Sequence, residues 1–145
     1  MPAPSRTPAA PPMPDVAAPA ALFPTDALAR LVDHFYAAVR ADALLGPVFA
    51  DAVEDWPQHQ ARLTDFWSSV MTTSGRYKGN PVAAHAAHAN RISPEMFNRW
   101  LELWAKSTRE TMPPEAAAAL QAKAARIAIS LKLALYFRLP ARAGA

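Results

Sequence analysis

Residues 77–85 read Tyr77-Lys78-Gly79-Asn80-Pro81-Val82-Ala83-Ala84-His85, and this stretch decides how the middle of the chain folds and where its chemistry lies. Gly79-Asn80-Pro81 predicts a loop, after which residues 82–90 are expected to form two short helical turns. His85 follows Pro81 and Val82 by four and three residues, so their carbonyl groups can accept one of its ring N–H groups. The other imidazole nitrogen is then available to a metal.

Two segments upstream of this stretch have the spacing of apolar side chains that is typical of amphipathic helices. The first is expected to begin at Thr25 as N-cap and to end at Gly46-Pro47, before a short turn at residues 48 and 49. Its apolar stripe comprises Leu28, Leu31, Val32, Phe35, Tyr36 and Val39. The second is expected to begin at Pro57, and its apolar face comprises His59, Leu63, Phe66, Trp67 and Val70.

Two further helices are expected downstream. Ser93 and Pro94 predict an N-cap followed by the first helical residue, and Pro113-Pro114 ends that helix. Its stripe comprises Phe97, Trp100, Leu101, Trp104 and Thr108. The last helix is expected from Glu115 to about Arg138, with alanines that permit close helix approach. Because no segment alternates with period two over the length of a strand, the predicted fold class is all-α.

The composition fits one domain of 145 residues with a core of relatively few large side chains. The chain has no cysteine, which excludes disulfides, thiolate metal sites and haem attachment through Cys-x-x-Cys-His. The fifteen Lys and Arg residues are dispersed and the net charge is only +3, which argues against a nucleic-acid surface. The sequence contains no run of about 18 apolar residues, so no membrane span is predicted. We therefore expect a cytoplasmic protein with no nucleic-acid or membrane partner.

Proline dominates the first part of the chain. Residues 1–24 hold eight of the fifteen prolines, mostly separated by alanine. Proline removes backbone donors and disfavours helix, so a disordered extension with polyproline character is expected. A role as ligand for a proline-reading module is the alternative. The predicted organisation is an extension over residues 1–24, one domain over 25–139 and a flexible tail over 140–145.

A set of four side chains has the pattern expected around an iron porphyrin. A five-coordinate haem iron needs one neutral imidazole as axial ligand, and His85 meets this need. On the opposite side, Tyr36 O–H and Trp100 N–H can donate to a diatomic ligand that gains negative charge on ferrous iron. His59 shares a helix face with Leu63 and is assigned to the ligand entrance. There it has three alternative roles: gating access, donating to the ligand or binding iron as sixth ligand.

Several short motifs follow one another in order and are more specific together than singly. They are Phe35-Tyr36-x-x-Val39-Arg40, Leu45-Gly46-Pro47-x-Phe49, Trp56-x-x-His59 followed by Phe66-Trp67, Tyr77-x-Gly79-x-Pro81-x-x-x-His85, and Phe97-x-x-Trp100. In these motifs the chain from about Asp26 to Phe137 resembles the truncated haemoglobins, and most of all their group III or P-type branch. The resemblance implies a two-over-two helical sandwich around non-covalent haem b, with His85 as proximal iron ligand. It also implies that Tyr36, His59 and Trp100 form the distal ligand-binding site.

The remaining residues of the expected cofactor site are walls and anchors. The walls that exclude water from the iron are expected to include Leu63, Phe66 and Trp67. The candidates to hold the haem propionates are Arg62, Arg76, Tyr77 and Arg91, and solvent exposure is the alternative for each arginine. Taken singly, each histidine or aromatic residue here is more often a packing residue, so the haem interpretation rests on the whole set.

Two more histidines receive no firm role. His34 lies off the apolar stripe of its helix and is expected to be exposed. His88 follows His85 by three residues, but two nitrogens without a carboxylate or thiolate make a poor metal site. Contact with a haem propionate and solvent exposure are the alternatives for His88.

Three functions compete. The first is reversible binding of dioxygen or another diatomic ligand, in a polar pocket that favours retention over rapid oxygen transport. The second uses the same pocket for nitric-oxide dioxygenation, nitric-oxide detoxification, peroxidase-type chemistry or electron transfer. It requires a partner reductase, because the sequence has no flavin or nicotinamide module. The third is a helical interaction module without a cofactor, which predicts a colourless protein.

Overall fold

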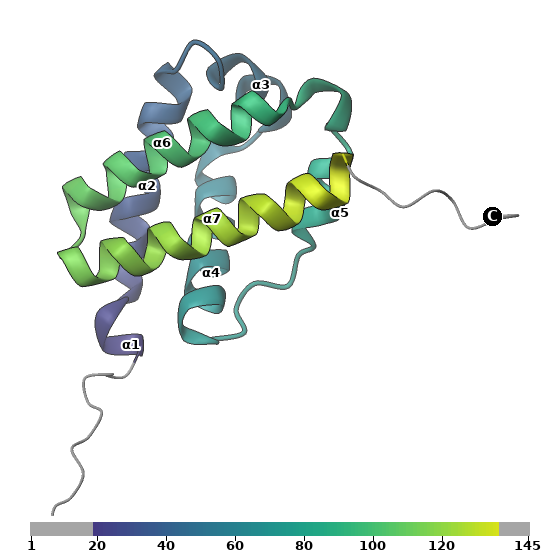
Figure 1. Ribbon diagram of the computed structural model, residues 1–145. Helices are drawn as coiled ribbons and strands as arrows, with labels where there is room; N and C mark the ends of the chain where they lie inside the picture. Colours follow the sequence, from purple (N-terminus) through teal and green to yellow (C-terminus); the bar gives the residue numbers. More distant parts are fainter. Residues whose placement is uncertain (1–18, 137–145) are drawn as a thin grey trace, which may run out of the picture.

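The computed structural model describes residues 19–136, and all regular structure within that range is helical. Two antiparallel helix pairs cross one another, α2 with α4 and α6 with α7 (Figure 1). Helix α2 (Thr25–Ala41) packs against both α4 (Trp56–Thr72) and α6 (Pro94–Thr111), while α6 packs along α7 (Pro114–Tyr136). The all-α prediction is therefore confirmed, and the two crossed pairs form a two-over-two sandwich.

Regular structure begins before Thr25. Helix α1 (Pro19–Leu22) precedes α2, and Phe23, which follows α1, is only 5% exposed within the main core. These residues belong to the segment for which the sequence predicts a disordered extension, and burial of the aromatic ring accounts for the difference. The rest of that predicted extension, residues 1–18, and the predicted tail over 140–145 lie outside the described residues.

Helix α2 buries the whole of its predicted apolar stripe. The helix begins at Thr25, but Pro24 holds the N-cap position and its carbonyl accepts a hydrogen bond from the Leu28 N–H at 3.0 Å. Thr25 as N-cap was thus wrong, because its hydroxyl instead accepts a hydrogen bond from Arg76 at 3.1 Å.

The turn expected at residues 48 and 49 is instead part of helix α3 (Gly46–Ala52). Pro47 lies in the first turn of α3, where a missing N–H leaves no helical hydrogen bond unmade. The corner before α3 is fixed by the carboxylate of Asp42. This carboxylate accepts hydrogen bonds from the backbone N–H groups of Leu44 and Leu45, at 3.1 and 3.0 Å, and from Arg99 Nε at 2.7 Å. Since Arg99 lies on α6, a contact distant in sequence helps to organise this corner.

Three helix starts carry side-chain caps. Asp55, Asn80 and Ser93 each accept a hydrogen bond from the backbone N–H three residues later, at 3.0, 3.1 and 3.4 Å. Helix α4 consequently starts one residue before Pro57, its predicted first residue. The two turns expected over residues 82–90 are divided between helix α5 (Pro81–Ala86) and the 3-10 helix η2 (Ala89–Arg91).

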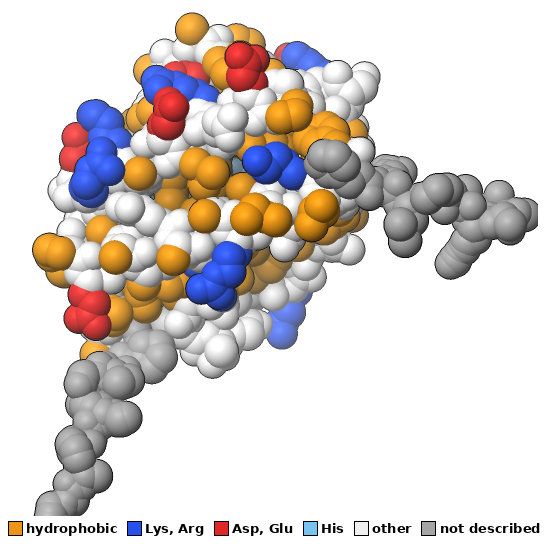
Figure 2. Space-filling model, viewed as in Figure 1, with side chains coloured by type: hydrophobic (Ala, Val, Ile, Leu, Met, Phe, Trp, Pro, Cys, Tyr) orange, Lys and Arg blue, Asp and Glu red, His pale blue; other side chains and the backbone are white. Residues whose placement is uncertain are grey.

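Tryptophan rings and alanines build the centre of the sandwich. Trp104 on α6 stacks on Trp67 of α4 at 4.4 Å between ring centroids, and its N–H donates to the Leu120 carbonyl at 3.2 Å. Small side chains let α7 approach closely, and the buried ones are Ala116, Ala117, Ala124 and Ala128. On the outer face of α6 and α7, charges of both signs lie between apolar side chains (Figure 2). No helix within residues 19–136 is long and apolar enough to cross a membrane.

Candidate functional site

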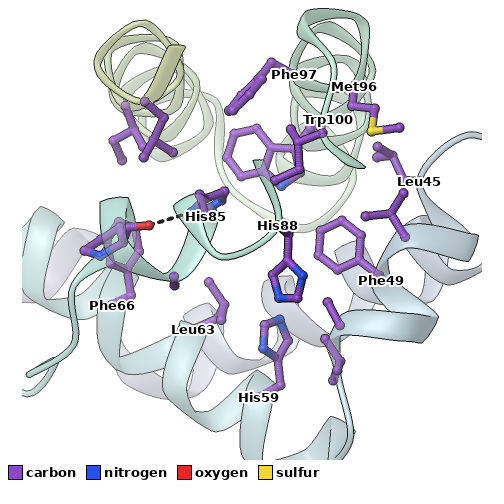
Figure 3. Close-up of a pocket in the computed structure, with 18 of the residues that line it drawn as sticks. Leu45, Phe49, His59, Leu63, Phe66, His85, His88, Met96, Phe97 and Trp100 are labelled. Carbon is purple, nitrogen blue, oxygen red and sulfur yellow. Dashed lines mark hydrogen bonds between the residues drawn. The ribbon is translucent and has the colours of Figure 1, made fainter. Parts of the chain in front are cut away.

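A cavity of about 340 Å³ lies among the helices, with walls from α2 to α7. This volume is typical of small-molecule sites, which occupy about 300–1,000 Å³. Of the residues expected at a cofactor site, Arg76 and Arg91 do not line the cavity, and the other nine do: Tyr36, His59, Arg62, Leu63, Phe66, Trp67, Tyr77, His85 and Trp100. Figure 3 shows that His59 and His85 enter it from different helices.

His85 is held in a defined orientation on α5. Its Nδ1 lies 2.7 Å from the Pro81 carbonyl oxygen, so this ring nitrogen carries the proton and donates it to the carbonyl. The expected acceptor is therefore present, and it is supplied by the first residue of a helix that Asn80 caps. The ring also lies 6.4 Å from Phe97, nearly parallel to it. Nε2 is left with a lone pair, as an axial iron ligand requires.

Tyr36 and Trp100 lie together on another wall of the cavity, supplied by α2 and α6. Tyr36 is 4% exposed, and burial raises the pKa of its phenol far above the ordinary value. The side-chain interaction with Trp100 lowers this pKa, but by less than burial raises it. The phenol therefore remains protonated at neutral pH and keeps a hydrogen to donate. Phe35 fixes both residues by edge-to-face contacts, at 4.8 Å from Tyr36 and 5.7 Å from Trp100.

His59 projects from the first turns of α4 into an aromatic cage. Its ring centroid lies 5.3 Å from that of Tyr36 and 5.6 Å from that of Trp56, with both contacts edge-on. Arg40 covers Trp56 from the outside at 4.4 Å. This stacking gives the Val39-Arg40 and Trp56-x-x-His59 motifs a shared structural role.

The Nε2 atom of His59 is buried and has no hydrogen-bond partner among the described residues. Burial lowers the pKa of His59, and the positive charge of Arg62 lowers it further, so the imidazole is neutral at pH 7. A buried polar atom without a partner is costly unless a ligand satisfies it. The structure thus points a neutral, unsatisfied imidazole nitrogen toward the site.

The Tyr77-x-Gly79 motif, in the loop between α4 and α5, contributes Tyr77 to the wall of the cavity. Tyr77 packs edge-on against Phe66 at 5.1 Å between ring centroids. Its ring also lies directly against Gly79, where a Cβ atom would come within 3.0 Å of the ring. Glycine at this position therefore lets Tyr77 fold over the loop and reach the cavity.

The arginines expected near a propionate are separated by the structure. Arg62 lines the cavity and has no ion pair among the described residues. Arg91 instead pairs with Asp51 on α3, and Arg76 donates to Thr25. Both of these side chains are committed to contacts that sequence spacing alone does not indicate.

Sequence reasoning gave no firm place to His88, which the structure puts in the cavity wall. Its imidazole points toward that of His59 in Figure 3. The available signal was its separation of three residues from His85, which puts both near one side of a short helix. His34 lies outside the site. It is exposed on the surface, as predicted, and its Nε2 lies 2.8 Å from a carboxylate oxygen of Glu110.

The side chains at the cavity fit an iron porphyrin. Iron in a porphyrin needs one protein nitrogen, and His85 offers an oriented one. The cavity also supplies a buried imidazole nitrogen without a partner, two further donors and an apolar wall from Leu63, Phe66 and Trp67. Within residues 19–136, no three side chains of His, Cys, Asp or Glu gather as a site for a bare metal ion.

Comparisons with known proteins agree with this reading, although no protein-family model matches the chain. The sequence is 34% identical over 86 residues to Group 3 truncated hemoglobin ctb of Campylobacter jejuni, covering 57% of this chain and 67% of that protein. The structure is similar to the crystal structure of group III truncated hemoglobin from Campylobacter jejuni, with a TM-score of 0.70 and 30% identity. That match covers 77% of this chain and 91% of the other. Helix order, site residues and both similarities lead to one conclusion: this chain belongs to the group III truncated haemoglobins.

Proposed function

We propose that this chain binds haem b non-covalently and holds dioxygen, nitric oxide or another diatomic ligand beside a polar set of side chains. The observation that carries the proposal is the 2.7 Å contact between His85 Nδ1 and the Pro81 carbonyl, at a cavity also lined by Tyr36, His59 and Trp100. Membership of the truncated haemoglobins supports it. The absence of cysteine, which excludes thioether attachment, supports non-covalent binding.

The proximal role belongs to His85. Haem, when bound, supplies an iron with one open coordination position for a diatomic ligand. The bond from Nδ1–H to Pro81 selects the tautomer in which Nε2 is free, and it raises the basicity of the imidazole. Arg62 and Tyr77 are the anchors that we assign to the porphyrin carboxylates, because both reach the cavity.

The distal role belongs to Tyr36 and Trp100, with His59 as a third member. Tyr36 and Trp100 donate hydrogen bonds to the diatomic ligand from helices that are packed in the main core. A hydrogen bond to a charged acceptor contributes about 1.5–3 kcal/mol, so each well-aimed donor slows ligand release about ten- to hundredfold. Retention of the ligand, rather than rapid delivery, is the expected behaviour.

An absorption spectrum of the purified full-length chain tests the proposal. We expect a Soret band in the wild type, and we expect His85→Ala to lose haem or to change its iron coordination. His34→Ala is the matched control, because His34 is a surface histidine paired with Glu110. A wild-type protein that stays colourless after haem is added would refute the proposal and favour a helical interaction module.

The buried, neutral imidazole of His59 favours a second candidate, in which the pocket is enzymatic. A neutral imidazole beside a reacting ligand can accept and return a proton, as peroxidase-type chemistry requires. Nitric-oxide dioxygenation would use Tyr36 and Trp100 to hold oxygen. Nitric-oxide dioxygenation needs electrons from a partner reductase, and peroxidase-type chemistry needs them from a reducing substrate. Rapid mixing of oxygenated protein with nitric oxide, followed by reduction with cell extract, tests this candidate; absence of reductase-supported turnover would eliminate it.

A further inference from the structure

His88 lines the same cavity, yet the proposed function gives it no task. It lies in the link between α5 and η2, and Figure 3 shows its imidazole directed into the cavity. Its backbone is fixed on both sides: its N–H donates to the His85 carbonyl at 3.0 Å, and its own carbonyl accepts from the Arg91 N–H at 2.8 Å. These two hydrogen bonds therefore fix the backbone position from which the His88 side chain extends, close to the proximal histidine.

The surroundings of His88 differ from those of a metal-binding histidine. A ligating imidazole is normally oriented by a hydrogen bond from its other ring nitrogen, and His85 has such a bond to Pro81. The His88 side chain makes no hydrogen bond with any residue in the range 19–136. A ring nitrogen of His88 is therefore available to a ligand group in the cavity.

The charges around the cavity indicate which ligand group this is. A porphyrin carries two carboxylates, which need donors or cations from the protein. On the α4 side Arg62 is available, but on the α5 side the nearby arginines Arg91 and Arg76 are bonded to Asp51 and Thr25. Tyr77 reaches the cavity from the loop before α5, and His88 is a second cavity-lining donor, at the other end of α5 near the link to η2.

We propose that His88 binds one carboxylate of the porphyrin, while Arg62 serves the other side of the cavity. The Arg91–Asp51 pair supports this role, because it ties η2 to α3 and so restrains the link that carries His88. The inference rests on the proposed function, since it names the recognition of the same cofactor.

The test compares two porphyrins on the full-length chain: iron protoporphyrin IX and its dimethyl ester, which lacks the charged carboxylates. Release of each is measured by transfer to an excess of a haem-scavenging apoprotein. We expect His88→Leu to speed the release of iron protoporphyrin IX about tenfold and to leave release of the ester unchanged. His88→Gln, which keeps a donor, is expected to recover part of the loss, and His34→Leu is the surface control.

Each other outcome overturns the inference in a recognisable way. Equal acceleration for both porphyrins would mean that His88 only packs against the ring, and no acceleration would mean that it makes no useful contact. If His85→Ala retained a histidine-bound iron spectrum that His85→Ala/His88→Leu lost, His88 would be an iron ligand instead. A wild type that binds neither porphyrin would refute the proposed function itself, which separates that failure from the failure of this inference.

Discussion

The two sides of the cavity are built by different forces. The proposed distal wall, comprising Tyr36, His59 and Trp100, packs on the main apolar core, where Phe35 at 0% exposure contacts two of its three members. The proximal segment, residues 80–92, contains α5 and η2, and neither helix has a buried residue. It is held by the Asn80 cap, the Pro81 contact, the Arg91–Asp51 pair and the packing of the partly buried Ala89 and Ile92 against α6 and α7.

This difference predicts unequal local stability. Apolar burial stabilises the distal wall whether or not a cofactor is present. The proximal segment has only partly buried apolar contacts, a few hydrogen bonds and an ion pair that is largely exposed to solvent, and such an ion pair contributes little. We therefore expect the proximal segment to open locally before the distal wall does, and cofactor binding to stabilise it most.

The largest effect should come from breaking the core behind the distal wall. Trp104→Ala removes a ring that is 1% exposed and stacks on Trp67, so we expect a loss of about 3–5 kcal/mol in the free energy of unfolding. Urea denaturation of the cofactor-free protein measures it. Trp104→Phe keeps most of the volume and should lose clearly less; equal losses would mean that packing does not hold this wall.

The distal donors should affect the ligand and leave the fold intact. Tyr36→Phe removes a hydrogen-bond donor with little change in shape, and Trp100→Phe removes a donor but keeps an aromatic ring. For each we expect ligand dissociation to become about ten- to hundredfold faster while haem stays bound. Stopped-flow measurement of oxygen release tests both variants. Unchanged rates in both would remove the proposed distal role.

Substitutions in the proximal segment should affect the retention of haem more than the global stability of the protein. Asn80→Ala removes the cap of α5, which is worth about 1 kcal/mol, and should speed haem release severalfold with little change in global unfolding. Hydrogen exchange of the α5 amides and haem transfer measure the two quantities. Asn80→Ser retains a cap and should behave like the wild type. A large loss of global stability would show that the proximal segment belongs to the core after all.

The smallest effect concerns the corner between α2 and α3, next to the distal wall. Burial by itself would raise the pKa of Asp42, but hydrogen bonds from the backbone N–H groups that follow it and from Arg99 lower it below its ordinary value. The ionised carboxylate therefore stabilises the fold above the unfolded-state pKa, and this contribution is lost as the pH falls through the lower folded-state pKa. Because the Arg99 side chain is 41% exposed, solvent screening keeps the effect small.

Acid unfolding curves test this corner. The free energy of unfolding of the wild type should fall more steeply below about pH 4 than that of Asp42→Asn, which has no charge to lose. Asp33→Asn, on the exposed face of α2, serves as control. Parallel curves for Asp42→Asn and the wild type would contradict the lowered pKa.

Local features of the sequence were enough to predict much of this molecule. The apolar stripe of α2, the Ser93 cap and the spacing from Pro81 to His85 all act within a few residues, so helix geometry translates them directly into structure. The absence of cysteine likewise excludes haem attachment through thioether bonds. Nine of the eleven candidate cofactor-site residues reach the cavity because they follow such local rules.

The remaining features depend on contacts between residues far apart in the chain, and only the tertiary structure decided them. Arg91 was expected near the cavity but pairs with Asp51, while the Thr25 hydroxyl accepts a hydrogen bond from Arg76 instead of capping its helix. Phe23 enters the core, and His88 turns into the cavity. A sequence fixes which groups each residue carries and which helix face bears them, but partner choice among several nearby charges and rings depends on how the helices pack.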